Sequence, residues 1–267
     1  MPMSPEVLAP SPRVRPSGSV PAAAPTASIV AACVIAYEAG RTIETVLAGV
    51  PSSAGGAPVH IYVADDASSD ETAELARVWA DGPGRPPTEV TSHPVNLGYG
   101  GNQVWCMRRA VAQDTLAFAL VHGDAQYPAS ALPELVAPIL DGSADVVLAS
   151  RMLIPGGAKA GGMPRHRRVG NALLSRLQNR LTGADLSEWH TGLRAYRTET
   201  IAALDLDELP AGFDFDTAIT LALLDTGARF AEIPIATHYG DEVSRIPVWT
   251  TGLRILWRTL AHRWRRP

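Results

Sequence analysis

The sequence predicts an α/β protein with a single main domain, in which helices flank a mostly parallel central sheet. The chain has 267 residues, enough for one large domain with a substantial core. From Ser28 onward, short apolar runs alternate with segments of helical periodicity. The apolar runs are continuous rather than interrupted by polar residues, which is typical of strands buried on both faces of a parallel sheet.

Expected strands and helices alternate over the first 150 residues. The strands are expected at IVAACVIA (29–36), HIYVA (60–64), EVTSH (89–93), LAFALVH (116–122) and ADVVLAS (144–150). The helices are expected at 41–50, at 71–80, from the glycine-rich turn NLGYGGN (96–102) to Ala112, and at about 132–140. This alternation predicts a parallel sheet covered by helices on both faces.

The second half of the chain is less regular. A basic helix is expected over about 165–182, then a turn ending in SEWHTGLRAYR (187–197), a helix over about 213–225 and the strand RFAEIPI (229–235). Near the C-terminus an arginine-flanked apolar stripe recurs at helical spacing. The stripe consists of Trp249, Leu253, Leu256, Trp257, Leu260 and Trp264. Two interpretations are open: packing on the sheet domain as core, or peripheral docking on an anionic membrane.

Composition divides the chain into three parts. Residues 1–27 are rich in Pro, Ala and Ser and are expected to be disordered, and they lack the apolar region of a secretory signal. Residues 28–246 form the α/β domain, and residues 247–267 a basic amphipathic helix. No later apolar stretch is long enough to span a bilayer. We therefore expect a cytoplasmic protein that is soluble or peripheral at the membrane.

Charge and cysteine content limit the partners. The formal net charge is −4, which argues against a nucleic-acid partner recruited by bulk basic charge. Nearly all cations are arginines, and Lys159 is the only lysine. Cys33 and Cys106 cannot form a disulfide framework, and each lies in an apolar stretch. We expect both to be small buried hydrophobic residues in a reducing compartment.

Polar motifs follow three of the expected strands: DDASSD (65–70), HGDAQ (122–126) and SRM (150–152). Ligands of open α/β sheets bind outside the carboxyl ends of the strands, so these motifs predict the site. Asp124 and Gln126 could together hold a hard divalent cation and leave positions open for water and a diphosphate. The alternative for Asp124 is a cap of the next helix.

The other motifs also allow two interpretations. Asp65 and Asp66 could accept hydrogen bonds from a base or a ribose, or could cap a helix, as Asp70 with Ser68 or Ser69 is expected to do. NLGYGGN lacks the ending of a phosphate-binding P-loop, and its glycines could serve ligand contact or packing. Arginines of PRHRR (164–168) could bind a phosphate or form a solvated face. His190, with Glu188 nearby, could be an acid, a base, a phosphate donor or a structural residue.

In this order and spacing, the motifs resemble those of the inverting family 2 glycosyltransferases of the GT-A fold, and among these the dolichyl- or polyprenyl-phosphate sugar synthases. The resemblance runs from about Ser28 to Ser244. It is carried by VIAYEAGRTI (34–43), VADDASSDET (63–72), NLGYGGN, HGDAQYP (122–128), DVVLASRM (145–152), HTGLRAYR (190–197) and EIPI (232–235). It implies a Rossmann-like GT-A domain that uses a nucleoside-diphosphate sugar.

The resemblance also implies roles for individual residues. The nucleotide-sugar site would consist of Ala36, Tyr37, Glu38, Asp65, Asp66, Asn96, Gly98 and Asp124. Within it, Tyr37 and Asp66 would contact the base and Asp65 the nucleoside. Asp124 and Gln126 would hold Mg²⁺ or Mn²⁺ on the diphosphate. The acceptor phosphate would be bound by Arg151, Arg167 or Arg168, Asn171 and His190. The catalytic residues would be Asp124, Arg151, Arg167, Arg168 and His190.

The chain departs from the family pattern at several positions. Ile35 replaces a proline, and Glu38-Ala39 replaces an Asn-Glu pair that contacts the base. His122 stands where the first Asp of the D-x-D motif is usual, which puts the metal site in question. Asn171 replaces a serine expected on the acceptor phosphate.

Three functions follow as hypotheses. The first is inverting transfer of a hexose-type sugar from a UDP- or GDP-sugar to a lipid or isoprenoid phosphate, which brings its own anionic nucleophile and needs no strong base. The second is transfer to a hydroxyl or amine of a cell-envelope or natural-product acceptor, which needs a base from Glu188, Asp214, Asp216 or His190. The third is an inactive sugar-nucleotide-binding protein, suggested by His122.

Overall fold

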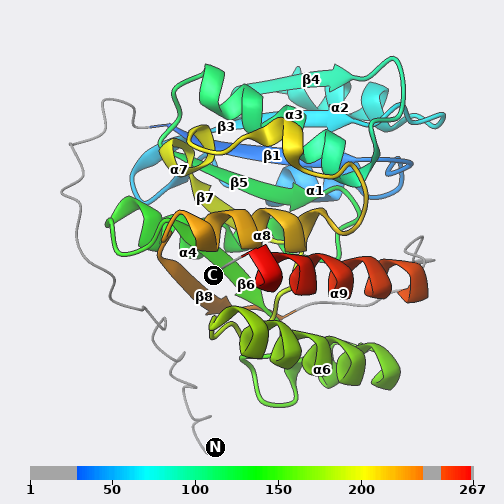
Figure 1. The fold of residues 1–267 in the computed structure, drawn as a ribbon. Coiled ribbons are helices and arrows are strands. Elements are labelled where there is room, and N and C mark those ends of the chain that lie inside the picture. The colour runs from blue at the N-terminus through cyan, green and yellow to red at the C-terminus, as the bar shows by residue number, and fades with distance from the viewer. Residues whose placement is uncertain (1–28, 237–247, 266–267) are drawn as a thin grey trace, which may run out of the picture.

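The computed structural model describes residues 29–236 and 248–265 (Figure 1). The segment 1–27, expected to be disordered, lies outside the described residues, as does the expected boundary at residue 246 between the main domain and the C-terminal helix. Within the described ranges, no helix is long and apolar enough to cross a membrane.

A single mixed sheet runs through the molecule in the order β2-β3-β1-β5-β7-β6-β8, with β4 added beside β3. The strands are β1 (Val30–Ala36), β2 (Ser53–Ala54), β3 (Ala57–Asp65), β4 (Thr88–Ser92), β5 (Ala117–His122), β6 (Val146–Ser150), β7 (Arg194–Arg197) and β8 (Phe230–Pro234). The pairs β1–β3, β1–β5, β3–β4 and β6–β8 are parallel. The predicted α/β class with a mostly parallel central sheet is confirmed.

Strand β7 corrects the sequence-based expectation, which assigned this segment to a turn. It lies between β5 and β6 and is antiparallel to both. Its four residues contain no apolar run, and Arg194 in it is fully buried. The Arg194 guanidinium is satisfied by the carbonyls of Trp189 and Thr191 and by Thr220. These partners are distant elements or irregular turns, so a local pattern could not predict a buried strand here.

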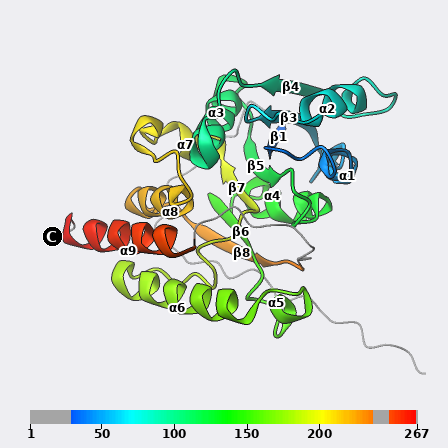
Figure 2. The ribbon, with the colours of Figure 1, turned by 90° about the vertical axis from the view of Figure 1, so that its right-hand side faces the viewer.

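Helices cover both faces of the sheet (Figure 2). They are α1 (Ile43–Gly49), α2 (Thr72–Ala80), α3 (Gly98–Ala112), α4 (Leu132–Leu140), α5 (Gly157–Ala160), α6 (Arg165–Thr182), α7 (Thr198–Ala202), α8 (Phe215–Asp225) and α9 (Val248–Arg265), with 3₁₀ turns at Ala129–Ala131 and Leu206–Glu208. Alternate residues of β1 enter two cores: Val34 packs with α1 and α4 residues, and Ile35 with α3 and α8 residues. Continuous burial of β1 therefore follows from helices on both sides.

The two cysteines are buried, as expected, but the prediction of two separate thiols is wrong. Cys33 of β1 and Cys106 of α3 are joined by a disulfide, with their Cα atoms 6.2 Å apart. Both belong to the core on the α3 side of the sheet. Since 73 residues separate them in sequence, only the packing of α3 on β1 brings their sulfurs together.

Candidate active site

The predicted motifs meet at one edge of the sheet. The register pairs Ala36 of β1 with Asp65 of β3 on one side, and Ile35 with His122 of β5 on the other. The motifs DDASSD and HGDAQ therefore lie on either side of the end of β1, where Tyr37 and Glu38 follow. Strand β6 runs parallel to β5, because both are antiparallel to β7, so Arg151 emerges at the same edge. This convergence is what the parallel topology predicted.

Asp65 is fixed at the end of β3. It is 1% exposed, and its carboxylate accepts hydrogen bonds from the Ser92 hydroxyl (2.6 Å) and the Ser68 amide (3.3 Å). Glu38 is held close by in a left-handed conformation (φ 53°), and its carboxylate accepts the amide and hydroxyl of Ser69. Beside it, Tyr37 is 47% exposed. An exposed ring next to a fixed acidic turn is a suitable contact for a nucleoside.

Asp66 caps helix α3, which is a structural role that the sequence analysis gave only as an alternative. One carboxylate oxygen accepts the Leu97 amide at 2.6 Å and the other the Gly98 amide at 3.1 Å. Burial raises the pKa of Asp66, and these two hydrogen bonds oppose the rise. Asn96 donates to the Asp66 carbonyl and accepts from Gly98. The base contact of Asp66 remains a prediction.

The glycines of NLGYGGN lie against packed neighbours, and the contact of Gly98 with the nucleotide remains a prediction. The segment leads into the first turn of α3, and Gly98 has φ 78°. A β-carbon on Gly100 would collide with the Pro210 carbonyl oxygen and with Phe215 of α8. Asp70 also behaves as expected, since its carboxylate accepts the Thr72 amide at the start of α2.

The expected metal ligands lie in the turn after β5. Asp124 is partly exposed, and one of its oxygens accepts the Gln126 amide at 3.0 Å, so it closes its own turn rather than capping α4. No group of three or more His, Cys, Asp or Glu side chains with metal-binding geometry occurs in the described ranges. Asp124 and Gln126 are hard oxygen donors at a solvent-facing turn. They suit a Mg²⁺ or Mn²⁺ ion that takes its remaining ligands from water and a diphosphate.

His122 is occupied by aromatic neighbours. Its ring makes edge contacts with Tyr99 and Tyr127, at centroid distances of 5.7 and 5.9 Å. It also lies against Gly192, where any β-carbon would collide with the ring. The Tyr99 hydroxyl donates to Asp216 at 3.0 Å. His122 thus belongs to a network of Tyr99, Tyr127 and Asp216, whose two tyrosines the sequence analysis missed, although Tyr127 is part of the HGDAQYP motif.

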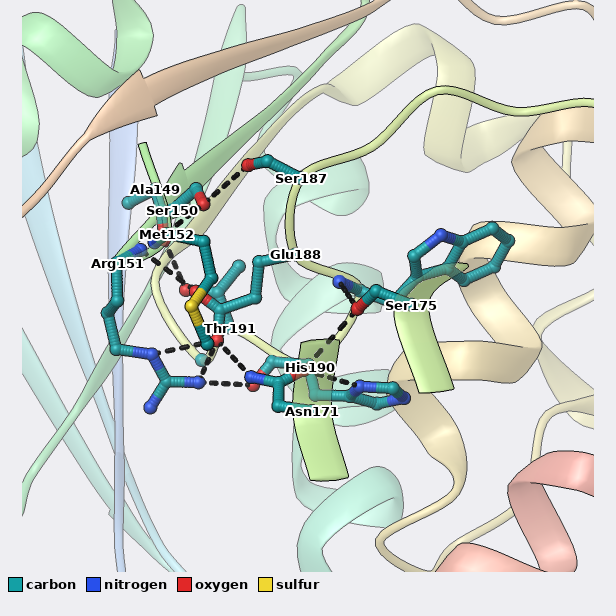
Figure 3. Close-up of polar contacts among 12 residues, drawn as sticks. Ala149, Ser150, Arg151, Met152, Asn171, Ser175, Ser187, Glu188, His190 and Thr191 are labelled. Carbon is teal, nitrogen blue, oxygen red and sulfur yellow. Dashed lines mark hydrogen bonds and ion pairs between the residues drawn. The ribbon is translucent and has the colours of Figure 1, made fainter. Parts of the chain in front are cut away.

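Arg151 is the centre of a buried polar cluster (Figure 3). It is 7% exposed and forms an ion pair with Glu188, which is fully buried. The Arg151 Nε lies 2.8 Å from a Glu188 oxygen, and the other Glu188 oxygen accepts the Arg151 amide at 2.8 Å. Asn171 of α6 also donates to Glu188, at 2.6 Å. The cluster joins the end of β6 and the N-terminal half of α6 to the turn before β7.

The His190 imidazole lies beside Asn171, and the His190 carbonyl accepts a hydrogen bond from the Arg151 guanidinium at 3.0 Å (Figure 3). Its Nδ1 is 3.2 Å from the Asn171 side-chain oxygen, which can only accept, so Nδ1 carries the proton. Burial lowers the pKa of His190 to about 3, assisted by the charges of Arg194 and Arg151. A neutral imidazole whose N–H is already used is poorly suited to donate to a phosphate. The predicted catalytic and acceptor roles of His190 therefore gain no support from its geometry.

A pocket of about 310 Å³ opens beside this cluster. It is lined by Arg151, Met152, Ile154, Pro155, Gly156, Ala158, Lys159 and Arg168. Within the described ranges no carboxylate forms an ion pair with Lys159, Arg167 or Arg168, and the buried Arg167 Nε has no hydrogen-bond partner there. Sequence reasoning missed Lys159 and the short helix α5 that carries it. Its being the only lysine was the available signal.

The model of the family described as "Glycosyl transferase family 2" matches residues 31–204. The chain belongs to this family. It is 32% identical over 199 residues to a dolichyl-phosphate hexose transferase of Haloferax volcanii, which covers 74% of this chain and 78% of the relative. It is 29% identical over 178 residues to an undecaprenyl-phosphate mannosyltransferase of Micrococcus luteus, covering 66% of this chain and 70% of the relative.

Solved structures agree on the fold. A glucosyl-3-phosphoglycerate synthase of Mycobacterium tuberculosis, in complex with UDP, superposes with a TM-score of 0.66 and covers 88% of this chain and 80% of its own. Its sequence identity is 17%, so this likeness establishes the GT-A fold alone. Other structures of that synthase contain UDP with Mn²⁺ or Mg²⁺. The chain is a glycosyltransferase with the predicted GT-A fold.

The acidic residues considered as a base in this glycosyltransferase are all engaged. Glu188 is paired with Arg151, and Asp214 with Arg258 of α9. Asp216 accepts the Tyr99 hydroxyl and lies 3.8 Å from the Arg194 guanidinium. Each of the three is at most 8% exposed. Glu188 and Asp214 are each paired with an arginine, so neither is placed to remove a proton from an incoming hydroxyl, whereas the Asp216 Oδ1 atom is buried without a hydrogen-bond partner in the described ranges.

Proposed function

We propose that this glycosyltransferase moves a hexose-type sugar from a UDP- or GDP-sugar to a polyprenyl or related lipid phosphate, with inversion. The pocket beside Arg151 carries the proposal. It combines the cations Arg151, Lys159 and Arg168 with the apolar side chains of Met152, Ile154 and Ala158. A phosphate on an isoprenoid chain has this combination of chemistry: an anion for the guanidinium groups and a hydrocarbon for the apolar wall.

The engaged carboxylates favour a phosphate over a hydroxyl acceptor. A hydroxyl must lose its proton as it attacks, and general-base catalysis is worth about 10²–10⁴-fold in rate. A phosphate monoester is already anionic near neutral pH and needs no such base. The names of the curated relatives, a dolichyl-phosphate hexose transferase and an undecaprenyl-phosphate mannosyltransferase, support the same acceptor class.

The residues of this chain would then act mainly by alignment. An acceptor phosphate oxygen attacks the anomeric carbon, the bond from that carbon to the diphosphate breaks, and its electron pair leaves with the nucleoside diphosphate. A divalent cation held by Asp124 and Gln126 would offset charge on the leaving diphosphate. Lys159 and Arg168, which form no ion pair with a carboxylate of the described residues, would hold the acceptor beside Arg151, so that two facing anions can approach. In-line attack of this kind inverts the anomeric centre.

The donor and the location belong to the same proposal. The UDP complexes of the structural relatives support a nucleoside-diphosphate donor at the end of β1, with UDP as the first nucleotide to test. A lipid acceptor implies that transfer takes place at a membrane surface. We expect this to be the cytoplasmic surface of the membrane. His122 also suggested the third hypothesis, an inactive sugar-nucleotide-binding protein. The assay described next tests that hypothesis too, because such a protein would bind the nucleotide without turnover.

Nucleoside diphosphate release should be followed with Mn²⁺ and a panel of UDP- and GDP-sugars. Short-chain polyprenyl phosphate and the matching polyprenol, which differ only in the phosphate, serve as paired acceptors. We expect release with the phosphate and none with the alcohol. Lys159→Ala and Arg168→Ala should each raise the acceptor KM. Arg165→Ala should not, because Arg165 is exposed on α6 and does not line the pocket. Equal use of the polyprenol, or nucleotide binding without turnover, would refute the proposal.

A further inference from the structure

Exposed apolar side chains are concentrated on two helices. Nine large apolar residues are exposed among those the structure describes, and six of them belong to α6 and α9. The six are Val169, Leu173 and Leu177 of α6, and Leu253, Trp257 and Trp264 of α9. We call these six the apolar face. The predicted C-terminal stripe is thus divided: Leu256 and Leu260 are half-buried, and the side chain of Trp249 lies outside the described residues.

The apolar face is continuous along each helix. Val169, Leu173 and Leu177 recur every four residues and so share one side of α6, whose opposite side buries Ser175 and Gln178. On α9 the core-facing side buries Thr251, Ile255 and Thr259, which places Leu253 and Trp257 outward. Figures 1 and 2 both show α6 and α9 lying side by side at one end of the molecule. Two neighbouring helices therefore present apolar side chains to solvent.

The charged side chains of these two helices are basic, with no acidic residue among them. Helices α6 and α9 contain nine arginines and no acidic residue, in a chain whose formal net charge is −4. Arg165, Arg176 and Arg180 are exposed on α6, and Arg254 and Arg263 on α9. Apolar residues flanked by arginine, with tryptophan among them, are typical of a surface at the headgroup level of an anionic bilayer.

The charge also decides between two occupants of this face. A symmetric dimer through α6 and α9 would place the arginines of one copy against those of the other, since such an interface pairs identical patches. An anionic lipid surface instead neutralises them, while Trp257 and Leu173 enter the interfacial region. We infer that the apolar face docks this enzyme onto anionic membranes. The inference rests on the proposed function, since docking would bring the enzyme to a lipid acceptor. The pocket proposed to bind the phosphate of that acceptor includes Arg168, at the start of α6.

The test is flotation of the full chain with vesicles of phosphatidylcholine, alone or mixed with phosphatidylglycerol. Wild-type protein should float only with the mixed vesicles, and less as salt rises. Leu173→Ser with Trp257→Ser should reduce the partition coefficient by at least about tenfold, since two apolar side chains no longer enter the interface. Arg176→Gln with Arg180→Gln should reduce it by about fivefold per arginine.

A matched control separates docking from general stickiness. Val78 is 64% exposed on α2, away from both helices, so Val78→Ser should leave flotation unchanged. Transfer to a water-soluble short-chain phosphate should be the same in all these variants, because none alters the pocket. If the wild-type protein did not transfer sugar to this short-chain phosphate, the result would contradict the proposed function and not the docking inference. Equal flotation of all variants, no flotation of wild type, or a dimer abolished by Trp257→Ser would overturn the docking inference.

Discussion

At the scale of single residues, His122 at the end of β5 and Asp124 in the turn after it have different surroundings. Asp124 is partly exposed, with one oxygen engaged by the Gln126 amide, whereas His122 is packed between Tyr99 and Tyr127. The sequence alone treats His122 as a weakened metal ligand. In the structure the His122 ring instead packs against Tyr99 and Tyr127. The expected metal ligands are Asp124 and Gln126, so the proposed metal site does not depend on His122.

Asp124→Ala should abolish metal-stimulated transfer. The diphosphate would lose its main counter-charge, and we expect turnover to fall by about 10²–10³-fold, comparable to loss of other transition-state charge stabilisers. His122→Ala should cost much less. Initial rates measured across a Mn²⁺ titration provide the test. Metal-stimulated turnover that survives in Asp124→Ala would place the ion elsewhere.

His190 should make stability depend on pH. Its pKa is about 3 in the folded protein, against about 6.5 when unfolded, so the unfolded chain binds a proton that the folded chain does not. The contribution is fully present above about pH 6.5 and is lost as the pH falls toward 3. The advantage of wild type over His190→Gln should shrink by up to about 1.4 kcal/mol per pH unit below pH 6.5. Urea unfolding at several pH values measures this, and parallel curves for the two proteins would contradict it.

At the scale of elements, the start of α3 depends on a carboxylate that was expected in the nucleotide site. Asp66 accepts the Leu97 and Gly98 amides with different oxygens, and Asn has only one acceptor oxygen, so Asp66→Asn should cost about 1 kcal/mol through the lost hydrogen bond. It should also lower nucleotide affinity if Asp66 contacts the base. Thermal unfolding and calorimetric titration with UDP and GDP separate the two effects. A lower melting temperature with unchanged affinity for both nucleotides would leave Asp66 with the cap alone.

The contact between α3 and α8 should be intolerant of side chains. Gly100→Ala would drive a methyl group into the Pro210 carbonyl and Phe215, and we expect a loss of about 1–3 kcal/mol or more. Gly170→Ala in α6 is the matched control, since nothing lies within 4 Å of its added β-carbon. There the gain in helix propensity should stabilise by about 0.5–1 kcal/mol. Denaturant unfolding of both variants checks the contrast, and equal effects would show that the close approach is absent.

At the scale of the whole molecule, nucleotide and metal should stabilise the fold together. UDP at about 100 times its dissociation constant would add about 2.7 kcal/mol to the free energy of unfolding. We expect the melting temperature to rise with UDP plus Mn²⁺, to rise less with UDP and a chelator, and to be insensitive to Mn²⁺ in Asp124→Ala. A shift that does not depend on metal in the wild type would show that the diphosphate is bound without it.

The sequence was sufficient for the strands and helices whose patterns are local. Strand β1 was predicted to within one residue, and helix α6 over its full length. Motif order at strand ends predicted where Asp65, Asp124 and Arg151 converge, because parallel strands end at one edge. The family motifs predicted a glycosyltransferase of the GT-A fold, which the comparisons confirm.

Other features depend on contacts that no local pattern records. Strand β7, the Cys33–Cys106 disulfide and the pairing of Glu188 with Arg151 each join segments distant in sequence. The pocket was not predicted because Lys159 in its lining lies on α5. This helix has four residues, which is too short for a periodic signal in the sequence. Periodicity predicted the fold class, the polar motifs at strand ends predicted the edge of the sheet that holds the site, and the resemblance to the family predicted the chemistry. Only the tertiary structure decided which carboxylates are engaged, which cations remain without a carboxylate and which apolar side chains face solvent, because partners and burial are properties of packing rather than of sequence order.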